Sequence, residues 1–417
     1  MSIETVRQDA SAPQSVIRKP PGGATHLGFI DALRGWAFLG VLLCHAGQHV
    51  AGPYLLLKLA DQGQFGVQLF YIVSAATLFL SLNVRWRQDQ RPYTAFFIRR
   101  FFRIAPMFWV AIAFYVWWDG MGPRFWAPNG ITAADIAVTA AFAHGWHPLQ
   151  INAVVPGGWS VGIEMSFYLL MPLLFTWITS LRRALWFALM AIVAGEGMSH
   201  VFHRLIAAHW PAEQLYVVNK FTSCWLPSQL PVFALGGVLF FLLRRETETS
   251  APAAERSRLN PESPTGKAWL LFAMVAILGG ACVSWVNPVL KQHVVYSIVF
   301  VLFAWALSLN PLGFFVNRAT KYIGMISFSA YLSHFFALDA CEKLLDHAFG
   351  RHFGSGGGLD FTLLLAMSLP LTVVISSFTY RFIEKPGQRL GKKLIAMTDR
   401  QLPIQFKTTL PVSGTGS

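Results

Sequence analysis

The first apolar stretch of the chain contains two side chains that can do chemistry, Arg34 and His45. A helix returns to nearly the same face after eleven residues, and at about 1.5 Å per residue the two side chains are expected roughly 16 Å apart along that face. An ionisable group inside a bilayer costs about 2.5–3.5 kcal/mol on insertion scales. The pair therefore predicts a polar site within a membrane, with a guanidinium to hold an anion and an imidazole to move a proton.

The same two residues also have a purely structural interpretation. Arg34 can pair with Asp31, three residues earlier, and anchor the helix at one membrane surface, while His45 bonds to a neighbouring helix. Either residue alone fits this interpretation. Because both lie on one expected face, we favour the functional one and expect Arg34 and His45 to line one passage.

Three arginines precede the third apolar stretch: Arg99, Arg100 and Arg103. On a helix, the first two lie four and three residues from the last, so all three can converge on one anion, and guanidinium groups suit phosphates. The alternative is a basic membrane boundary in contact with lipid headgroups. The use of arginine throughout, without lysine, favours phosphate recognition.

Two later stretches add polar groups to apolar surroundings. Ser160 is expected to be the N-cap of a helix, which places Glu164 about one turn inside the membrane, where it can orient His45 or hold a polar acceptor. The alternative is a water-exposed acid that the helix dipole favours. His334 lies near the middle of the ninth apolar stretch, and we expect a hydrogen bond between helices there rather than haem ligation.

The composition defines the elements that must position these residues. Hydrophobic residues make up 54% of the 417 residues and charged residues only 13%, which is far below the usual share in soluble domains. We predict an all-α, polytopic integral membrane protein with about ten transmembrane helices. The expected spans are 30–50, 66–83, 104–118, 159–180, 184–198, 225–243, 268–286, 294–310, 322–342 and 360–383.

The net charge of +13 is explained by the membrane rather than by nucleic acid. With a cytoplasmic amino terminus, most of the 33 Lys and Arg residues fall on the inner side, so both termini are predicted to be cytoplasmic. The four cysteines have no metal-binding or redox spacing, and no metal is expected. The predicted organisation is a disordered amino terminus 1–27, a transmembrane domain 28–390 with a cytoplasmic linker 244–267, and a cytoplasmic tail 391–417.

Taken together and in this order, the motifs resemble the acyltransferase-3 family of membrane acyltransferases, which includes O-acetyltransferases of bacterial surface glycans. The resemblance covers about residues 28–390. The matching segments are Arg34 to His45, Gly66 to Ser74, Arg99 to Pro106, Trp159 to Tyr168, Tyr331 to His334 and Glu384 to Pro386. Gln68, Ala75 and Met165 stand where members usually have an acid, a glycine and, in many, a second glutamate.

The resemblance implies a multi-pass enzyme of the bacterial inner membrane that moves an acyl group, most commonly acetyl, from cytoplasmic acyl-CoA to a hydroxyl. The acceptor would be a cell-surface or exported carbohydrate or a glycolipid, and acyl-CoA would be a co-substrate with no bound cofactor. His45 would be the catalytic base, which either deprotonates the hydroxyl or accepts the acyl group transiently. Glu164 would be the partner of this histidine or of the acceptor. The expected donor-binding residues are Arg34, Arg99, Arg100 and Arg103, with Asp31, Ser160 and His334 in support.

Two other functions fit buried charges in a membrane. A transporter or flippase could move a glycan or an anionic substrate along them, although we find no internal repeat of the kind that marks many transporters. A sensor or binding scaffold could have the fold without its chemistry. The predicted acyltransferase differs from both because it must release free CoA.

Overall fold

The computed structural model describes residues 28–86, 88–207, 209–249, 263–283, 290–349 and 357–400. Within these ranges the chain is all-α and forms no strand, only an isolated bridge between Arg124 and Ala127. The elements are α1 (Gly28–Gln48), α2 (Tyr54–Asp61), η1 (Gln62–Phe65), α3 (Gly66–Arg85), α4 (Pro92–Trp118), α5 (Ala133–Ala140), η2 (His144–Trp146), α6 (Trp159–Trp177), α7 (Leu181–Ala207), η3 (Ala212–Gln214), α8 (Leu215–Cys224), α9 (Leu226–Thr249), α10 (Pro264–Cys282), α11 (Gln292–Leu309), α12 (Arg318–Met325), α13 (Ser327–Phe349), α14 (Gly358–Thr379), η4 (Tyr380–Glu384) and α15 (Lys385–Arg400).

Nine helical stretches in the described ranges are long and apolar enough to cross a membrane. The expected span 322–342 corresponds to α12 and α13 and is not among the nine; the last turns of α13 carry Asp339, Glu342 and Lys343. The predicted class, an all-α multi-pass membrane protein, is confirmed. Several boundaries differ, and the first concerns the arginine cluster: α4 begins at Pro92 instead of near 104, so the cluster is part of the helix.

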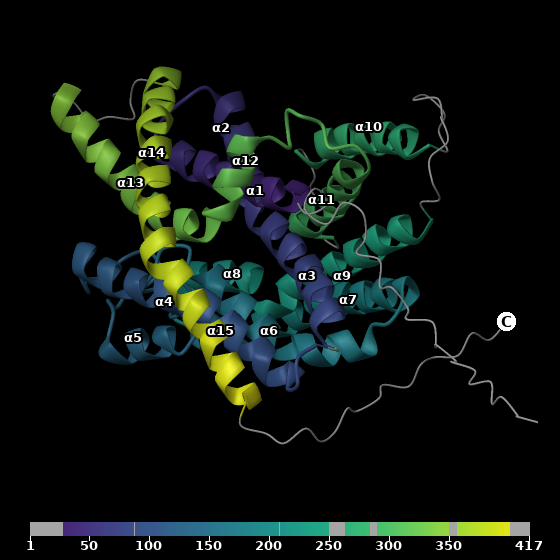
Figure 1. The fold of residues 1–417 in the computed structure, drawn as a ribbon. Coiled ribbons are helices and arrows are strands. Elements are labelled where there is room, and N and C mark those ends of the chain that lie inside the picture. Colours follow the sequence, from purple (N-terminus) through teal and green to yellow (C-terminus); the bar gives the residue numbers. More distant parts are fainter. Residues whose placement is uncertain are drawn as a thin grey trace, which may run out of the picture.

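Close backbone contacts fix α1 beside α12 (Figure 1). A Cβ on Gly324 would lie 1.7 Å from the backbone oxygen of Asp31, and one on Gly35 would lie 2.2 Å from that of Thr320. Only glycine permits such an approach, which is the usual way in which small residues bring membrane helices together. The contact leaves α1, which carries Arg34 and His45, little freedom to rotate.

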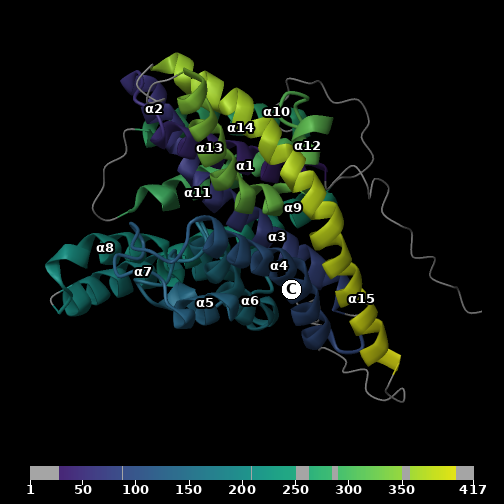
Figure 2. The same cartoon turned by 90° about the vertical axis from the view of Figure 1, so that its left-hand side faces the viewer.

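Helix α3 lies between α1 and α9 and also contacts α6 (Figure 2). Stacked aromatic rings hold three of these helices together: Tyr71 of α3 lies 4.3 Å from Phe233 of α9, and Phe167 of α6 lies 4.0 Å from the same ring, measured between centroids. Each such pair contributes about 0.5–1.5 kcal/mol beyond its buried area. The polar face of α3 is thereby presented to α1 and α6.

The carboxyl-terminal helix continues beyond the predicted boundary. Instead of ending near 383, α14 passes through the π turn η4 into α15, which packs on α4 and extends to Arg400 (Figure 1). Glu384 in this turn is buried and accepts hydrogen bonds from the backbone N–H of Ser329, at 3.0 Å, and from its hydroxyl. The carboxylate thus satisfies one of the free backbone N–H groups at the start of α13, that of Ser329.

The predicted linker 244–267 is narrower in the structure. Helix α9 continues to Thr249 and α10 begins at Pro264, where the Ser263 hydroxyl accepts a hydrogen bond from Gly266 N. The rest of that linker, 250–262, lies outside the described residues, as do the predicted amino terminus 1–27 and the last part of the tail, 401–417.

Candidate active site

Two neighbouring cavities between the helices share part of their lining. The first, which we call the arginine cavity, has a volume of about 70 Å³, and the second, the histidine cavity, about 1140 Å³. The arginine cavity is lined by Arg34, Val67, Phe70, Tyr71, Ser74, Arg103, Ile104, Ser160, Val161, Glu164, Tyr168, Ser327, Phe328 and Tyr331. His45 lines the histidine cavity, and Val67 and Tyr331 line both.

The predicted single passage is therefore not open in this structure. Arg34 and His45 both face cavities rather than lipid, as expected for functional groups, but they face different ones. Val67 of α3 and Tyr331 of α13 form the common wall between the two. The sequence placed the two side chains on one helix face; it contained no information on which residues of other helices would separate them.

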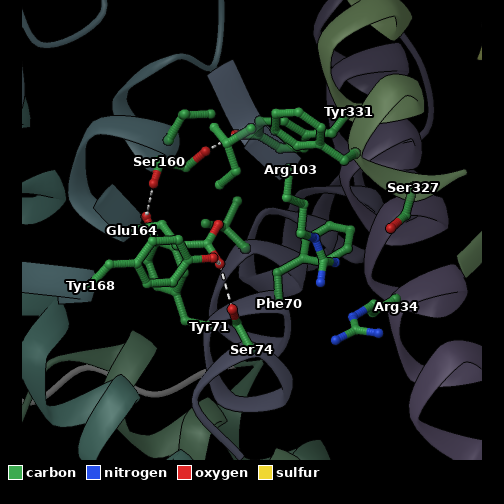
Figure 3. A pocket seen from close by; sticks show the side chains of 14 residues that line it. Arg34, Phe70, Tyr71, Ser74, Arg103, Ser160, Glu164, Tyr168, Ser327 and Tyr331 are labelled. Atoms are coloured by element: carbon green, nitrogen blue, oxygen red, sulfur yellow. Dashed lines mark hydrogen bonds between the residues drawn. The ribbon is translucent and has the colours of Figure 1, made fainter. Parts of the chain in front are cut away.

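Arg34 combines both sequence interpretations. Its guanidinium donates hydrogen bonds to Asp31 Oδ1 at 3.1 Å and to Thr77 Oγ1 at 3.1 Å, while it also lines the arginine cavity beside Arg103. Figure 3 shows the guanidinium groups of Arg34 and Arg103 on one side of this cavity, opposite Glu164. Two cations and one carboxylate in so small a space favour an anionic ligand.

Glu164 lies in the arginine cavity and not beside His45, which corrects one prediction. Its Oε1 accepts hydrogen bonds from the hydroxyls of Tyr168, at 2.6 Å, and of Ser74 (Figure 3). No hydrogen bond joins it to His45 in the described part of the chain. Tyr168 is one helical turn beyond Glu164 on α6, whereas Ser74 comes from α3, so only the fold brings this second donor to the carboxylate.

The three arginines of α4 do not converge, which corrects another prediction. Arg99 forms an ion pair with Asp89 and lines neither cavity. The guanidinium carbon of Arg100 lies 5.8 Å from the ring centroids of both Phe96 and Tyr168, and its buried Nε has no hydrogen-bond partner among the described residues. Of the cluster, only Arg103 lines the arginine cavity, because each long side chain finds its own neighbour.

Ser160 is not the helix cap that the sequence predicted. Gly158 occupies the N-cap position of α6, with no side-chain cap, and the Ser160 hydroxyl lies 3.0 Å from the Tyr331 hydroxyl, to which it can donate. Tyr331 donates in turn to the backbone oxygen of Gly157, also at 3.0 Å. Ser160 therefore helps to hold one of the two wall residues in place.

His45 is paired with the other predicted histidine. Nδ1 of His45 lies 3.0 Å from Nε2 of His334, and Nδ1 of His334 lies 2.7 Å from the backbone oxygen of Tyr331. His334 is fully buried and lines neither cavity. The expectation of a hydrogen-bonded interhelical role for His334 is met, and its partner is the candidate base itself.

The lining of the histidine cavity combines aromatic rings, amides and paired charges. Trp118, Trp126 and Trp159 supply flat apolar faces. Amide side chains come from Gln48, Gln64, Gln68, Asn152 and Gln229. Such a lining suits a ligand that has both apolar faces and many hydroxyl groups. Sequence reasoning missed this surface, because its residues come from seven separate parts of the chain.

Charged groups of the histidine cavity are mostly paired with each other. Arg124 lies 3.3 Å from Asp119, and Lys343 lies 2.8 Å from Asp339. Burial raises the pKa of the Asp119 carboxyl, although Arg124 opposes this effect. Paired charges of this kind leave a polar surface without a strong net field.

The fold and the two cavities define a multi-pass membrane protein with an imidazole in one cavity and guanidinium groups in the next. A family model described as an acyltransferase domain matches residues 27–381, and the chain belongs to this family, acyltransferase-3. No curated protein and no solved structure matches the chain. The protein is therefore a membrane acyltransferase, as its motifs predicted.

Proposed function

We propose that this acyltransferase moves an acyl group, acetyl in the simplest case, from acyl-CoA to a hydroxyl of an exported or cell-surface carbohydrate. The protein would lie in a bacterial inner membrane with both termini in the cytoplasm. Acyl-CoA would reach the arginine cavity from the cytoplasmic side, and the acceptor would enter the histidine cavity from the outside.

The donor side of the proposal rests on Arg34 and Arg103. Their guanidinium groups would bind the phosphates at the base of the pantetheine arm, since forked donors match phosphate oxygens. A cavity of about 70 Å³ suits a narrow arm rather than a nucleotide, which would stay outside. Glu164 Oε1 is occupied by Tyr168 and Ser74, so Oε2 is the oxygen available to an amide N–H of the arm.

One observation supports the proposal: Val67 and Tyr331 line both cavities. We infer that a displacement of these two side chains would connect the guanidinium groups to the imidazole. The arm of a thioester could then present its carbonyl to the histidine cavity. A closed wall would keep water from the thioester until an acceptor is bound.

The acceptor side rests on the size and lining of the histidine cavity. At about 1140 Å³ it is somewhat larger than ordinary ligand pockets, and its indole faces and amides suit the apolar ring faces and hydroxyls of sugars. An acceptor hydroxyl would transfer its proton to His45 as its oxygen attacks the thioester carbonyl. The C–S bond then breaks, the new ester bond remains, and His45 returns the proton to the CoA thiolate.

The test uses purified full-length protein in lipid nanodiscs with acetyl-labelled acetyl-CoA and polysaccharide extracted from cells that lack the protein. We expect free CoA and acceptor-bound label, with both requiring the polysaccharide. If a liposome assay instead shows transfer of unmodified glycan across the bilayer, the protein is a transporter. If the assays detect neither acyl transfer nor transport, the protein is a binding scaffold. Proton NMR of surface polysaccharide from cells with and without the protein then identifies the acceptor position.

A further inference from the structure

The His45–His334 pair fixes where the protons are. A backbone carbonyl oxygen only accepts hydrogen bonds, so His334 Nδ1, at 2.7 Å from Tyr331 O, must carry its proton. A neutral imidazole has one N–H, which leaves Nε2 of His334 as an acceptor. The contact of 3.0 Å from this atom to His45 Nδ1 then requires His45 Nδ1 to be the donor.

The same argument identifies the reactive atom of His45. With Nδ1 protonated, the lone pair of the neutral ring is on Nε2, and no side chain of the described residues forms a hydrogen bond with this atom. His45 lines the histidine cavity and is partly exposed there, whereas His334 is fully buried. The lone pair is thus on the ring nitrogen of His45 that does not bond to His334, and His45 lines the histidine cavity.

The packing of neighbouring aromatic rings further restricts the orientation of both imidazoles. The Phe335 ring lies 4.4 Å from His45 and 4.1 Å from His334, and the two imidazoles are 5.0 Å apart, measured between centroids. Phe38 packs edge-on against His334 at 6.1 Å. A flip of the His45 ring would place a C–H against His334 Nε2 and lose the hydrogen bond.

We propose that His334 is a positioning residue that holds His45 in the Nδ1–H tautomer, with Nε2 free to accept the proton of the acceptor hydroxyl. This rests on the proposed function. The arrangement is the counterpart of the carboxylate that orients a catalytic histidine in hydrolases. Here a neutral imidazole anchored to a backbone carbonyl does it, which avoids an unpaired buried charge between membrane helices.

The first test reads the tautomer directly and needs no substrate. Protein labelled with ¹⁵N in its histidine rings is reconstituted in lipid, and the His45 signals are assigned by difference from His45→Gln. We expect a protonated Nδ1 and an unprotonated Nε2 for His45. In His334→Phe, which keeps the ring shape without an acceptor, we expect a mixture of tautomers. An Nε2–H form in the wild type, or an unchanged spectrum in His334→Phe, would overturn the proposal.

The second test separates positioning from folding. His334→Phe should lower kcat by about 10²–10⁴ with little change in either KM, the range seen when general base catalysis is lost. His334→Gln, whose amide oxygen can accept from His45 Nδ1, should recover kcat to within about tenfold of the wild type, because one neutral hydrogen bond, to the Tyr331 carbonyl, is lost at about 0.5–1.5 kcal/mol. Equal losses in both variants would contradict positioning.

A matched control is available in His144, which is also buried and bonds a backbone carbonyl but lines neither cavity. His144→Gln should lower stability without lowering kcat per folded molecule. A failure of the proposed function can be told apart from a failure of this inference. If the wild-type protein transfers no acyl group, the proposed function is wrong, and the ¹⁵N spectra still decide whether His334 sets the tautomer of His45.

Discussion

The two cavities differ in size, charge and the way in which they are built. The arginine cavity is small and carries two guanidinium groups and one carboxylate from α1, α4 and α6. The histidine cavity is about sixteen times larger by the same measure, and it is lined by aromatic rings, amides and charges that are mostly paired. A narrow charged cavity beside a wide, nearly neutral one suits two substrates of different chemistry, each bound in its own cavity.

The largest effect on the rate of acyl transfer is expected in the histidine cavity. His45→Gln should lower kcat for acyl transfer by about 10²–10⁴, because the proton acceptor is lost. Insertion into the membrane should be unchanged, and His209→Gln, an exposed histidine that lines neither cavity, is the matched control. Transfer of labelled acetyl to the acceptor measures the rate. An unchanged rate in His45→Gln would show that His45 is not the catalytic base.

The second-largest effect should change only the KM for acyl-CoA, the donor. Arg34→Gln and Arg103→Gln should each raise KM for acyl-CoA by about 10- to 100-fold, because a hydrogen bond to a charged group is worth about 1.5–3 kcal/mol. The KM for the acceptor should change little. Arg99→Gln is the control, because Arg99 is paired with Asp89 away from the cavity. A rise in the acceptor KM instead would reverse the assignment of the two cavities.

Opening the wall should join the cavities and uncouple the reaction. Tyr331→Ala should increase acceptor-independent release of CoA several-fold, since water would reach the thioester. Tyr331→Phe keeps the ring and should release much less CoA, although it loses the hydrogen bond to Gly157. A thiol reagent measures free CoA with and without acceptor. Equal release by both variants would show that the ring does not separate the cavities.

A smaller effect should change only the KM for the acceptor. Trp118→Ala removes an aromatic face from the histidine cavity and should raise the acceptor KM by about 2- to 10-fold, as expected for about 0.5–1.5 kcal/mol of aromatic contact. The neighbouring Trp117 is 73% exposed and lines neither cavity. Trp117→Ala should leave both KM values unchanged. A shift in the acyl-CoA KM of Trp118→Ala would argue against separate substrate sites.

The smallest effect concerns the scaffold and not the cavities. Burial lowers the pKa of His144 below its ordinary value of 6.5, against the opposing effect of its bond to Gly158. The unfolded chain then binds more protons than the folded one, so the stabilisation is complete above pH 6.5 and is lost as the pH falls below it. Thermal unfolding between pH 5 and 8 should show less pH dependence for His144→Gln. An identical profile in both proteins would exclude this contribution.

Much of the fold and part of the site could be predicted from the sequence. Hydropathy defines the spans because a bilayer requires long apolar helices, and helical spacing places Arg34 and His45 on one face whatever surrounds them. The motifs also identified the acyltransferase family. The helical spacing of Arg99, Arg100 and Arg103 predicted that they converge on one anion, and this prediction was wrong. Long side chains that are neighbours on a helix can reach different partners, as these three do.

What only the tertiary structure decided is which helices meet. The sequence proposed Glu164 as the partner of either His45 or the acceptor. The packing of α1 against α12 and α13 brings His334 to the imidazole and leaves Glu164 with Ser74 and Tyr168. The wall between the cavities joins Val67 and Tyr331, which are far apart in the chain. The physical reason is that periodicity along one helix fixes directions within that helix, whereas contacts between helices depend on close packing at residues such as Gly35 and Gly324.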